Sequence, residues 1–320
     1  MPDKRIDVHI HFLPDYYREA LVTAGLTMPD GMPKIPDWSE DEALKAMDRL
    51  GIETAMFSIS SPGVHFGDDR AAAELARRVN ETAAQFVRKR PDRFGFFAIT
   101  PLPDAHGAVA EAVYALDQLG ADGVVLETNH HGVYLGDDKM APLYTELDRR
   151  KTVAFIHPTS PSCPCCESLA LGYPRPMLEF LFETTRSVMQ MILSGTTTRY
   201  ADLRVIVPHA GAMLSVLAGR VEMLMPVLEQ EQGQGFPDVR KELRKLHYDL
   251  AGAPVPELLG ALLHVADPQH LHYGSDWPFT PLDSCEELAA KLDATPLFDE
   301  DTHRAAMSGN ARRLFPRLAR

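Results

Sequence analysis

The sequence predicts an α/β protein, a (β/α)8 TIM-type barrel in which eight parallel strands form a ring inside a layer of helices. Short apolar or β-branched runs alternate with longer helical patterns along the chain, and eight such runs can be counted. The length of 320 residues is compatible with a single barrel domain spanning residues 1–320. An open doubly wound sheet is the alternative, but no G-x-G-x-x-G motif follows the first run.

Each predicted strand is a run that a helical pattern separates from the next. The strands are expected at residues 6–13, 52–60, 94–100, 123–128, 153–158, 204–209, 247–251 and 270–276. Ser39 and Glu42 form a capping box that begins the helix before the second strand, and Gly51 ends that helix. The later helices are expected near residues 69–90, 104–119, 140–150, 175–193, 213–229 and 255–265.

Residues 13–38 interrupt this alternation. The stretch is rich in residues that break regular structure, namely Pro14, Gly25, Pro29, Gly31, Pro33 and Pro36. A long connection of this kind in a compact domain is usually a functional loop. We therefore expect residues 13–38 to form a lid or small insertion over the mouth of the barrel.

The charge and hydropathy of the chain argue against two classes of partner. The formal net charge is -13 and no basic run is present, which argues against binding to nucleic acid. We see no signal-peptide pattern at the N-terminus and no apolar stretch near the roughly 18 residues that cross a bilayer. We expect a cytoplasmic protein without a membrane partner.

Polar residues at the ends of the predicted strands form a candidate metal site. In the first strand, His9 and His11 are two residues apart and therefore project from the same face. His157 ends the fifth strand and Asp276 ends the eighth, and the carboxyl ends of barrel strands meet at one mouth. Three imidazoles and a carboxylate suit a divalent ion, zinc first and manganese as an alternative. His209, at the end of the sixth strand, is either a further ligand or an acid/base beside the metal.

Cysteines are sparse and clustered. Cys163, Cys165 and Cys166 share one loop, while Cys285 stands alone. A structural zinc site normally needs four ligands, and no second cysteine pair completes one. A reduced loop is the preferred interpretation, with a zinc site or a redox pair as alternatives.

As a set, these motifs resemble the amidohydrolase superfamily. They are the His-x-His pair, the histidines after the fifth and sixth strands, the Ser-Asp-Trp-Pro-Phe run at 275–279 and the Gly-Asn-Ala-Arg-Arg-Leu-Phe run at 309–315. The chain is most similar to the aminocarboxymuconate semialdehyde decarboxylase branch, which includes γ-resorcylate, 5-carboxyvanillate and 6-methylsalicylate decarboxylases. The resemblance implies that one metal ion is bound by His9, His11, His157 and Asp276, with His209 as the acid/base. The fourth strand contains no lysine, which argues against a second metal.

The resemblance also bears on substrate binding. It implies that Arg220 reaches into a neighbouring subunit to hold a substrate carboxylate, and hence that the protein is a homodimer or a dimer-based oligomer. Ala43 stands where the semialdehyde decarboxylase has a substrate-binding arginine, which argues against that substrate. Phe12, Trp277 and Phe279, expected near the mouth, suggest a pocket for a compact aromatic acid.

We therefore expect nonoxidative decarboxylation of a small hydroxybenzoate-type acid, such as a methylsalicylate. Asp276 or His209 would donate a proton to the ring carbon that bears the carboxylate. The alternative is a metal-dependent hydrolase of a lactone, an amide or the carbon–carbon bond of a ring-cleavage product. A noncatalytic metal-binding barrel is a third interpretation.

Overall fold

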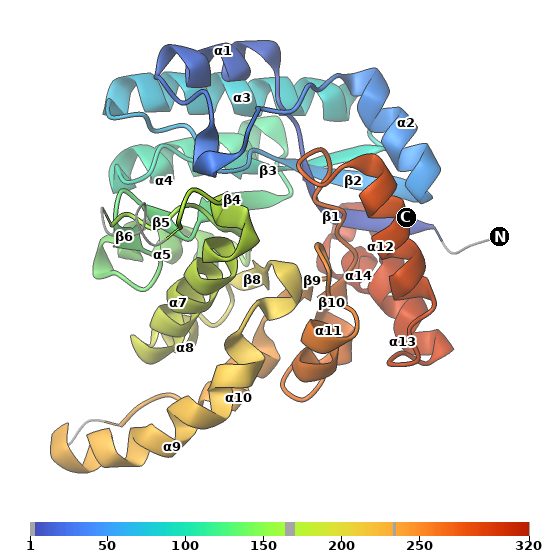
Figure 1. Cartoon of the computed structure of the whole chain (residues 1–320). Helices are drawn as coiled ribbons and strands as arrows, with labels where there is room; N and C mark the ends of the chain where they lie inside the picture. Colours follow the sequence, from blue (N-terminus) through green and yellow to red (C-terminus); the bar gives the residue numbers. More distant parts are fainter. Residues whose placement is uncertain (1–3, 164–169, 233–234, 320) are drawn as a thin grey trace.

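Eight parallel strands form the centre of the molecule in a computed structural model that describes residues 4–163, 170–232 and 235–319 (Figure 1). The strands are β1 (Arg5–His11), β2 (Ile52–Ser58), β3 (Phe94–Ile99), β4 (Gly123–Glu127), β7 (Val153–His157), β8 (Arg204–Val207), β9 (His247–Asp249) and β10 (Leu271–His272). Each strand pairs with the next in chain order. The amides of Val8 and His11 donate to the carbonyls of Tyr273 and Trp277 at 3.0 and 2.8 Å, which joins the first strand to the last segment. The predicted barrel is confirmed.

Helices surround the strands, and the buried apolar residues form one core cluster. The helices are α2 (Glu40–Leu50), α3 (Asp69–Lys89), α4 (Ala105–Tyr114), α5 (Ala141–Arg149), α7 (Glu179–Leu193), α8 (Thr196–Arg199), α9 (Leu214–Gln232), α10 (Val239–Lys245), α11 (Glu257–Leu262), α12 (Leu282–Asp293), α13 (Glu300–Arg304) and α14 (Asn310–Leu314). At the start of α2, the Ser39 hydroxyl accepts from the Glu42 amide at 3.2 Å, and Gly51 ends the helix in the left-handed conformation at φ 67°. The predicted helix boundaries at Ser39 and Gly51 are therefore confirmed.

All eight strands end earlier than the sequence predicts, and two of these ends fall just before residues of the candidate site. β8 stops at Val207 rather than residue 209, and β10 stops at His272 rather than residue 276. His209 and Asp276 have φ values of 55° and 59°, in the left-handed region that is costly for residues with a Cβ. This backbone conformation ends strand pairing at both positions.

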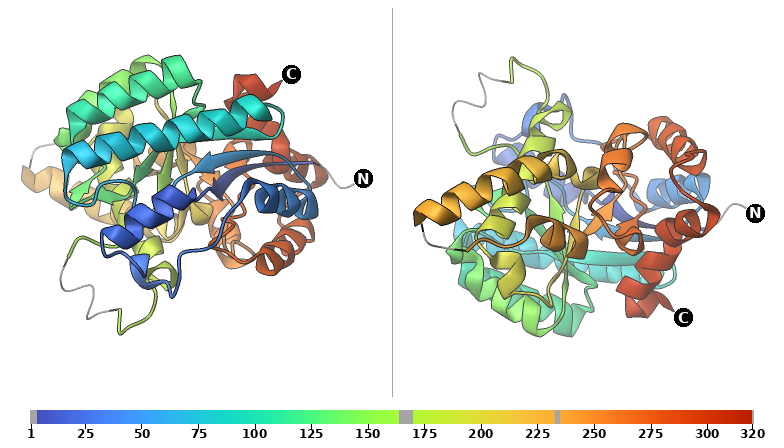
Figure 2. Two further views of the ribbon diagram at one scale, coloured as in Figure 1. Left: turned by 90° about the horizontal axis from the view of Figure 1, so that it is seen from above. Right: turned by 90° about the horizontal axis from the view of Figure 1, so that it is seen from below.

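The segment 13–38 contains a helix that the Pro/Gly content concealed. Helix α1 (Asp15–Thr23) is followed by a short 3-10 turn at Pro29–Gly31. α1 lies alongside α3 (Figures 1 and 2), where the Tyr16 hydroxyl donates to Thr82 at 2.8 Å. A second element absent from the prediction is the antiparallel hairpin of β5 (Asn129–His130) and β6 (Val133–Tyr134), which follows β4.

Helix α9 extends away from the barrel (Figures 1 and 2). Many of its apolar side chains are exposed, including Val216, Leu217, Met223, Leu224, Val227 and Leu228. The segment His209–Glu229 is long and apolar enough, by length and composition alone, to cross a membrane. Our expectation that no stretch approaches that length is therefore wrong. Apolar residues on successive turns leave this helix with a surface that its own chain does not cover.

Candidate metal and catalytic site

Three histidines and one aspartate converge at the carboxyl ends of β1, β7 and β10. One ligand atom from each of His9, His11, His157 and Asp276 lies within 4.8 Å of the others. Asp276 Oδ1 is 3.4 Å from His9 Nε2 and 3.2 Å from His11 Nε2. Both of these nitrogens are buried and have no hydrogen-bond partner among the described residues. Unpaired buried nitrogens beside a carboxylate form a donor set that fits a divalent ion.

Two of the histidines are oriented through the nitrogen that faces away from the cluster. His9 Nδ1 is 2.8 Å from Asp249 Oδ2, and both side chains are fully buried. His11 Nδ1 lies 3.1 Å from the Ser58 hydroxyl and 3.3 Å from its carbonyl oxygen. An acceptor at Nδ1 keeps the proton there and leaves Nε2 with a lone pair for a metal.

The third histidine has a carboxylate in the corresponding position. His157 Nδ1 is 3.6 Å from Glu127 Oε2, at the end of the neighbouring strand β4. On the opposite side of the ring, His157 Nε2 is 3.4 Å from the Ser60 hydroxyl. Burial, with His11 and His9 nearby, holds the pKa of His157 well below its usual value. The imidazole is therefore neutral, the form that binds metal.

The charges in the cluster follow from burial and from close partners. Burial opposes ionisation of Asp276, but the surrounding imidazoles of His11, His209 and His9 outweigh this effect and hold the pKa of this carboxyl well below its usual range. Burial likewise lowers the pKa of His9, but the carboxylate of Asp249 outweighs this effect and raises it to about 10. Metal binding at His9 Nε2 must therefore release a proton.

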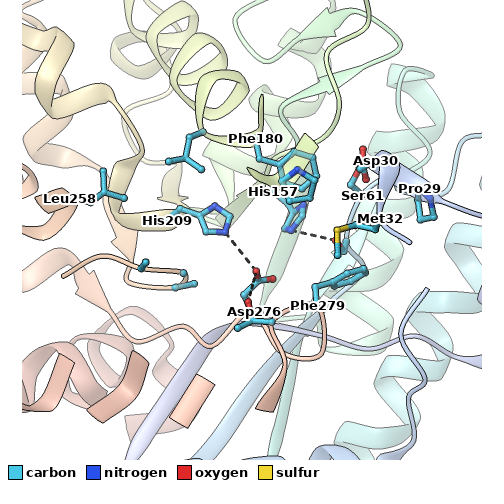
Figure 3. A pocket seen from close by; sticks show the side chains of 17 residues that line it. Pro29, Asp30, Met32, Ser61, His157, Phe180, His209, Leu258, Asp276 and Phe279 are labelled. Atoms are coloured by element: carbon cyan, nitrogen blue, oxygen red, sulfur yellow. Dashed lines mark hydrogen bonds and ion pairs between the residues drawn. The ribbon is translucent and has the colours of Figure 1, made fainter. Parts of the chain in front are cut away.

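His209 stands beside this cluster and faces open space (Figure 3). Its Nε2 is 3.9 Å from Asp276 Oδ2, so the two oxygens of that carboxylate face different partners. The amide of His209 donates to Asp249 Oδ1 at 3.0 Å, and this bond fixes the backbone of the left-handed residue. The arrangement allows His209 and Asp276 to exchange a proton with a molecule in the cavity above them.

The cavity above the cluster has a volume of about 400 Å³, within the range of small-molecule sites. Its walls are apolar on several sides, formed by Met32, Pro176, Phe180, Leu181, Leu258 and Phe279 (Figure 3). Its polar groups include Asp30, Ser60, Ser61, His157, His209, Asp276 and Thr280. No lysine or arginine lines it within the described part of the chain.

Comparison with known families identifies the family of the chain. The amidohydrolase family model matches residues 6–317, which is almost the whole chain. The chain belongs to the amidohydrolase family. The predicted resemblance is therefore confirmed.

Individual relatives of this amidohydrolase are decarboxylases by name. The 6-methylsalicylic acid decarboxylase acuB of Aspergillus aculeatus is 37% identical over 333 residues, covering 99% of this chain and 97% of the relative. A crystal structure of a protein described as amidohydrolase II has a TM-score of 0.91 and 34% identity, covering 98% of this chain and 100% of the other. A crystal structure of 2,6-dihydroxybenzoate decarboxylase complexed with 2,6-dihydroxybenzoate has a TM-score of 0.81 and 25% identity, covering 98% of this chain and 99% of the other.

The predicted substrate-binding residues of this amidohydrolase lie in different places. Phe279 lines the cavity, and its ring centroid is 5.5 Å from that of His11. Phe12 and Trp277 are buried and lie outside the cavity lining. Phe12 follows His11 in the chain and therefore points to the opposite face, where it packs against Trp38. We do not assign Phe12 or Trp277 a direct contact with substrate.

Arg220 and Ala43 lie away from the cavity of their own chain. Arg220 is exposed on α9 and does not line the cavity. Ala43 is fully buried on α2 and also lies outside the cavity lining. The alanine at this position therefore offers no contact to a substrate carboxylate.

Sequence reasoning missed two carboxylates, Asp249 and Glu127. Both are the last residue of an observed strand, at the same mouth of the barrel as His157, although the predicted strands 123–128 and 247–251 extend past them. No sequence pattern predicts that Phe180 and Met32 line the cavity, because they come from α7 and from the irregular segment 13–38 and not from strand ends.

The cysteine loop is only partly described. Cys163 is disulfide-bonded, which contradicts the reduced loop that we expected. Cys165 and Cys166 lie outside the described residues. Cys285 is a buried free thiol.

Proposed function

We propose that this protein is a metal-dependent nonoxidative decarboxylase of a small hydroxybenzoate-type acid, such as a methylsalicylate. The observation that carries the proposal is the His3Asp cluster beneath a cavity of about 400 Å³ with aromatic and aliphatic walls. Such a cavity accepts one aromatic ring, and its polar floor accepts a carboxylate and a phenolic oxygen. The decarboxylase names of the relatives agree with this choice.

One divalent ion would be held by His9, His11, His157 and Asp276. Zn²⁺ is the ion we expect and Mn²⁺ is the alternative, since this donor set accepts either. The bound ion supplies Lewis-acid polarisation of the substrate oxygens. The acceptors on the Nδ1 side of His9 and His11 hold these ligands in the required tautomer.

The reaction requires one proton at the ring carbon that carries the carboxylate. The pair of His209 Nε2 and Asp276 Oδ2 borders the cavity and supplies this proton. The carbon–carbon bond to the carboxylate then breaks, its electron pair restores the aromatic ring, and carbon dioxide leaves. Phe279 and Phe180 contact the ring faces and hold the reacting carbon beside the proton donor.

A second copy of the chain supplies the missing positive charge. The described lining of the cavity contains no lysine or arginine, although the substrate is an anion. Arg220 lies on α9, the helix whose apolar side chains are exposed. Covering this helix with a second copy buries the apolar surface and brings Arg220 to the partner's cavity. The working form is then a homodimer or a dimer-based oligomer, and a cytoplasmic location is our expectation.

Residues 13–38 act as a cover for the cavity. Pro29, Asp30 and Met32 line it from one side. Asp30 Oδ1 accepts hydrogen bonds from the amide and the hydroxyl of Ser160 at 3.2 and 2.5 Å, which ties the segment to the loop after β7. The cover limits access of water to the reacting carbon.

The decisive test offers the metal-loaded enzyme two sets of compounds. The first set is salicylate, 6-methylsalicylate and 2,6-dihydroxybenzoate, and the second is aryl esters and lactones. We expect carbon dioxide release from the first set only, with one deuterium in the product ring when the reaction runs in deuterium oxide. Substituting His209→Asn should lower kcat by about 10²- to 10⁴-fold while leaving the metal content unchanged. Turnover of esters or lactones without carbon dioxide release would establish the hydrolase instead.

The shared site is tested by mixing two impaired variants. Arg220→Ala should lower kcat/KM by about 10- to 100-fold, because a charge-assisted contact to the carboxylate is lost. Mixed dimers of Arg220→Ala and His209→Ala subunits should regain activity, since one of their two sites is intact. Val227→Glu should shift the protein to monomer in analytical ultracentrifugation. Verified mixed dimers without activity would exclude a role for Arg220 in the partner's site.

A further inference from the structure

The two carboxylate oxygens of Asp276 have different surroundings. Oδ1 lies 3.4 Å from His9 Nε2 and 3.2 Å from His11 Nε2, and it therefore belongs to the proposed metal site. Oδ2 faces His209 Nε2 at 3.9 Å, and both of these side chains line the cavity (Figure 3). The proposed decarboxylation depends on this division, because one oxygen serves the ion and the other serves the substrate.

An aspartate does not maintain this division by itself. The backbone of Asp276 is held in place, because its amide donates to the His9 carbonyl at 2.7 Å. The carboxylate, in contrast, can turn about its bond to Cβ, a torsion with a broad and roughly two-fold preference. Its orientation must therefore come from partners of the side chain.

Thr280 provides such a partner from the wall of the cavity. Its hydroxyl donates to Asp276 Oδ2 at 3.2 Å, a shorter distance than that from Oδ2 to His209 Nε2. An ionised carboxylate only accepts hydrogen bonds, so the hydroxyl proton must point toward Oδ2. Because Thr280 lines the cavity, this bond keeps Oδ2 on the cavity side of the carboxylate.

The position of Thr280 is fixed from two directions. Its amide donates to the Asp276 carbonyl at 2.9 Å, which closes the turn that leads from the barrel to α12. The buried Cys285 thiol on α12 donates to the carbonyl oxygen of Thr280 at 3.3 Å. Threonine also has restricted freedom about its first side-chain torsion, because it branches at Cβ. The hydroxyl is therefore held in place before substrate binds.

We propose that Thr280 is a positioning residue that keeps Asp276 Oδ2 directed into the cavity and away from the metal ion. The inference rests on the proposed function, because it assigns one oxygen of Asp276 to the ion and the other to the proton transfer. A carboxylate can bind a cation through one oxygen or through both. Without the Thr280 hydroxyl, Oδ2 can turn toward the ion, and the pair of His209 and Asp276 loses its contact with the substrate.

The test replaces Thr280 by valine, which exchanges the hydroxyl for a methyl group and keeps the branched shape. We expect Thr280→Val to lower kcat and kcat/KM for a hydroxybenzoate equally, by about 10- to 100-fold, as for loss of a hydrogen bond to a charged group. Thr280→Ser keeps the hydroxyl and should recover most of this loss. The control is Thr54→Val, which removes a hydroxyl that donates to the Asp92 carbonyl at 3.0 Å outside the cavity lining and should change neither value.

Two measurements on the metal site separate positioning from general damage. The Zn²⁺ affinity of Thr280→Val, measured by competition with a chelator, should equal or exceed that of the natural protein, because Oδ2 becomes available as a further ligand atom. The visible absorption bands of the Co²⁺-loaded protein report the coordination geometry. These bands should change in Thr280→Val and stay the same in Thr280→Ser. General damage would instead weaken Zn²⁺ binding by Thr280→Val.

An unchanged kcat in folded Thr280→Val would overturn the proposal, as would a Zn²⁺ affinity that falls together with kcat. Equal loss of kcat in Thr280→Ser and Thr280→Val would also overturn it, because the hydroxyl would then have no role. If the natural protein turns over no hydroxybenzoate, the proposed function fails and the Co²⁺ spectra decide. A change confined to Thr280→Val supports the role of Thr280, and identical spectra in all three proteins refute it. Thr280→Ala removes the same hydroxyl if Thr280→Val does not fold.

Discussion

Replacing Asp249 by asparagine should weaken metal binding without changing the backbone of the site. Asp249 is fully buried, and its Oδ1 accepts from the amides of His209 and Ala251, both at 3.0 Å. An asparagine keeps this acceptor and therefore keeps the backbone in place. The change falls on the other atom, Oδ2, which is 2.8 Å from His9 Nδ1.

The asparagine amide group would face His9 with a donor in place of an acceptor. To accept a hydrogen bond from this amide group, His9 must lose the proton on Nδ1. The neutral ring then carries its proton on Nε2. Nε2 is the atom that lies 3.4 Å from Asp276 Oδ1 and is the proposed metal ligand. Loss of a supporting carboxylate typically costs 10- to 100-fold in metal affinity, or about 1.4 to 2.7 kcal/mol. We expect Asp249→Asn to weaken metal binding by about 100-fold or more, because the substitution also inverts the tautomer of His9.

Metal affinity is measured by competition against a chromophoric chelator, with circular dichroism as a check on folding. The control is Asp267→Asn, which makes the same change at an aspartate whose hydrogen bond at 3.0 Å is to the Gln269 amide and not to a ligand imidazole. The reasoning is refuted if folded Asp249→Asn binds metal as tightly as the natural protein. It is also refuted if Asp267→Asn weakens binding equally.

Three further predictions concern packing, pH and metal removal. Gly274→Ala should destabilise the protein by about 1 to 3 kcal/mol in urea unfolding and weaken metal binding, because the new Cβ would lie 2.8 Å from the Cβ of His9. The control Gly260→Ala, which has open space around it, should change neither stability nor metal binding in this way. Burial lowers the pKa of His247 to about 2 and of His272 to about 3, so below the ordinary value near 6.5 the unfolded chain binds more protons than the folded one. The contribution of each of these histidines to the free energy of unfolding should therefore fall between pH 7 and pH 5 by about 1 to 2 kcal/mol, measured as the difference between the natural protein and His247→Gln or His272→Gln, and a difference that does not change with pH would contradict this. Dialysis against a chelator should abolish activity and lower Tm in proportion to the metal affinity, with recovery on adding Zn²⁺ or Mn²⁺; an unchanged Tm and activity would exclude a bound ion.

The barrel could be predicted from the sequence because its strands are buried on both faces. Runs such as residues 94–99 are buried throughout, and such runs stand out against amphipathic helices such as α3. Strand ends could not be predicted in the same way. Whether His209 continues β8 depends on a left-handed backbone that the hydrogen bond to Asp249 supports, and Asp249 is 40 residues away in the chain.

The candidate ligands were predictable because one geometric rule covers all of them. Period two brings His9 and His11 to one face, and strand direction brings His157 and Asp276 to the same mouth. The same period places Phe12 on the opposite face and excludes it from the site. The role of a residue that orients a ligand, such as Asp249, could not be predicted from the sequence. Nothing in the sequence indicates which nitrogen of His9 this aspartate contacts.

The metal cluster and the cavity walls depend on different parts of the chain. This difference identifies the residues that select the substrate. The orientation of the ligands depends on buried hydrogen bonds within the barrel, such as those of His9 and His11. The walls come from outside the barrel: Met32 from the segment after β1, Phe180 from α7 and Leu258 from α11. These helices and loops can change without disturbing the strands. Substitutions at wall positions should therefore change which aromatic acid is accepted while leaving metal affinity intact, whereas substitutions at the Nδ1 partners should change metal affinity for every substrate.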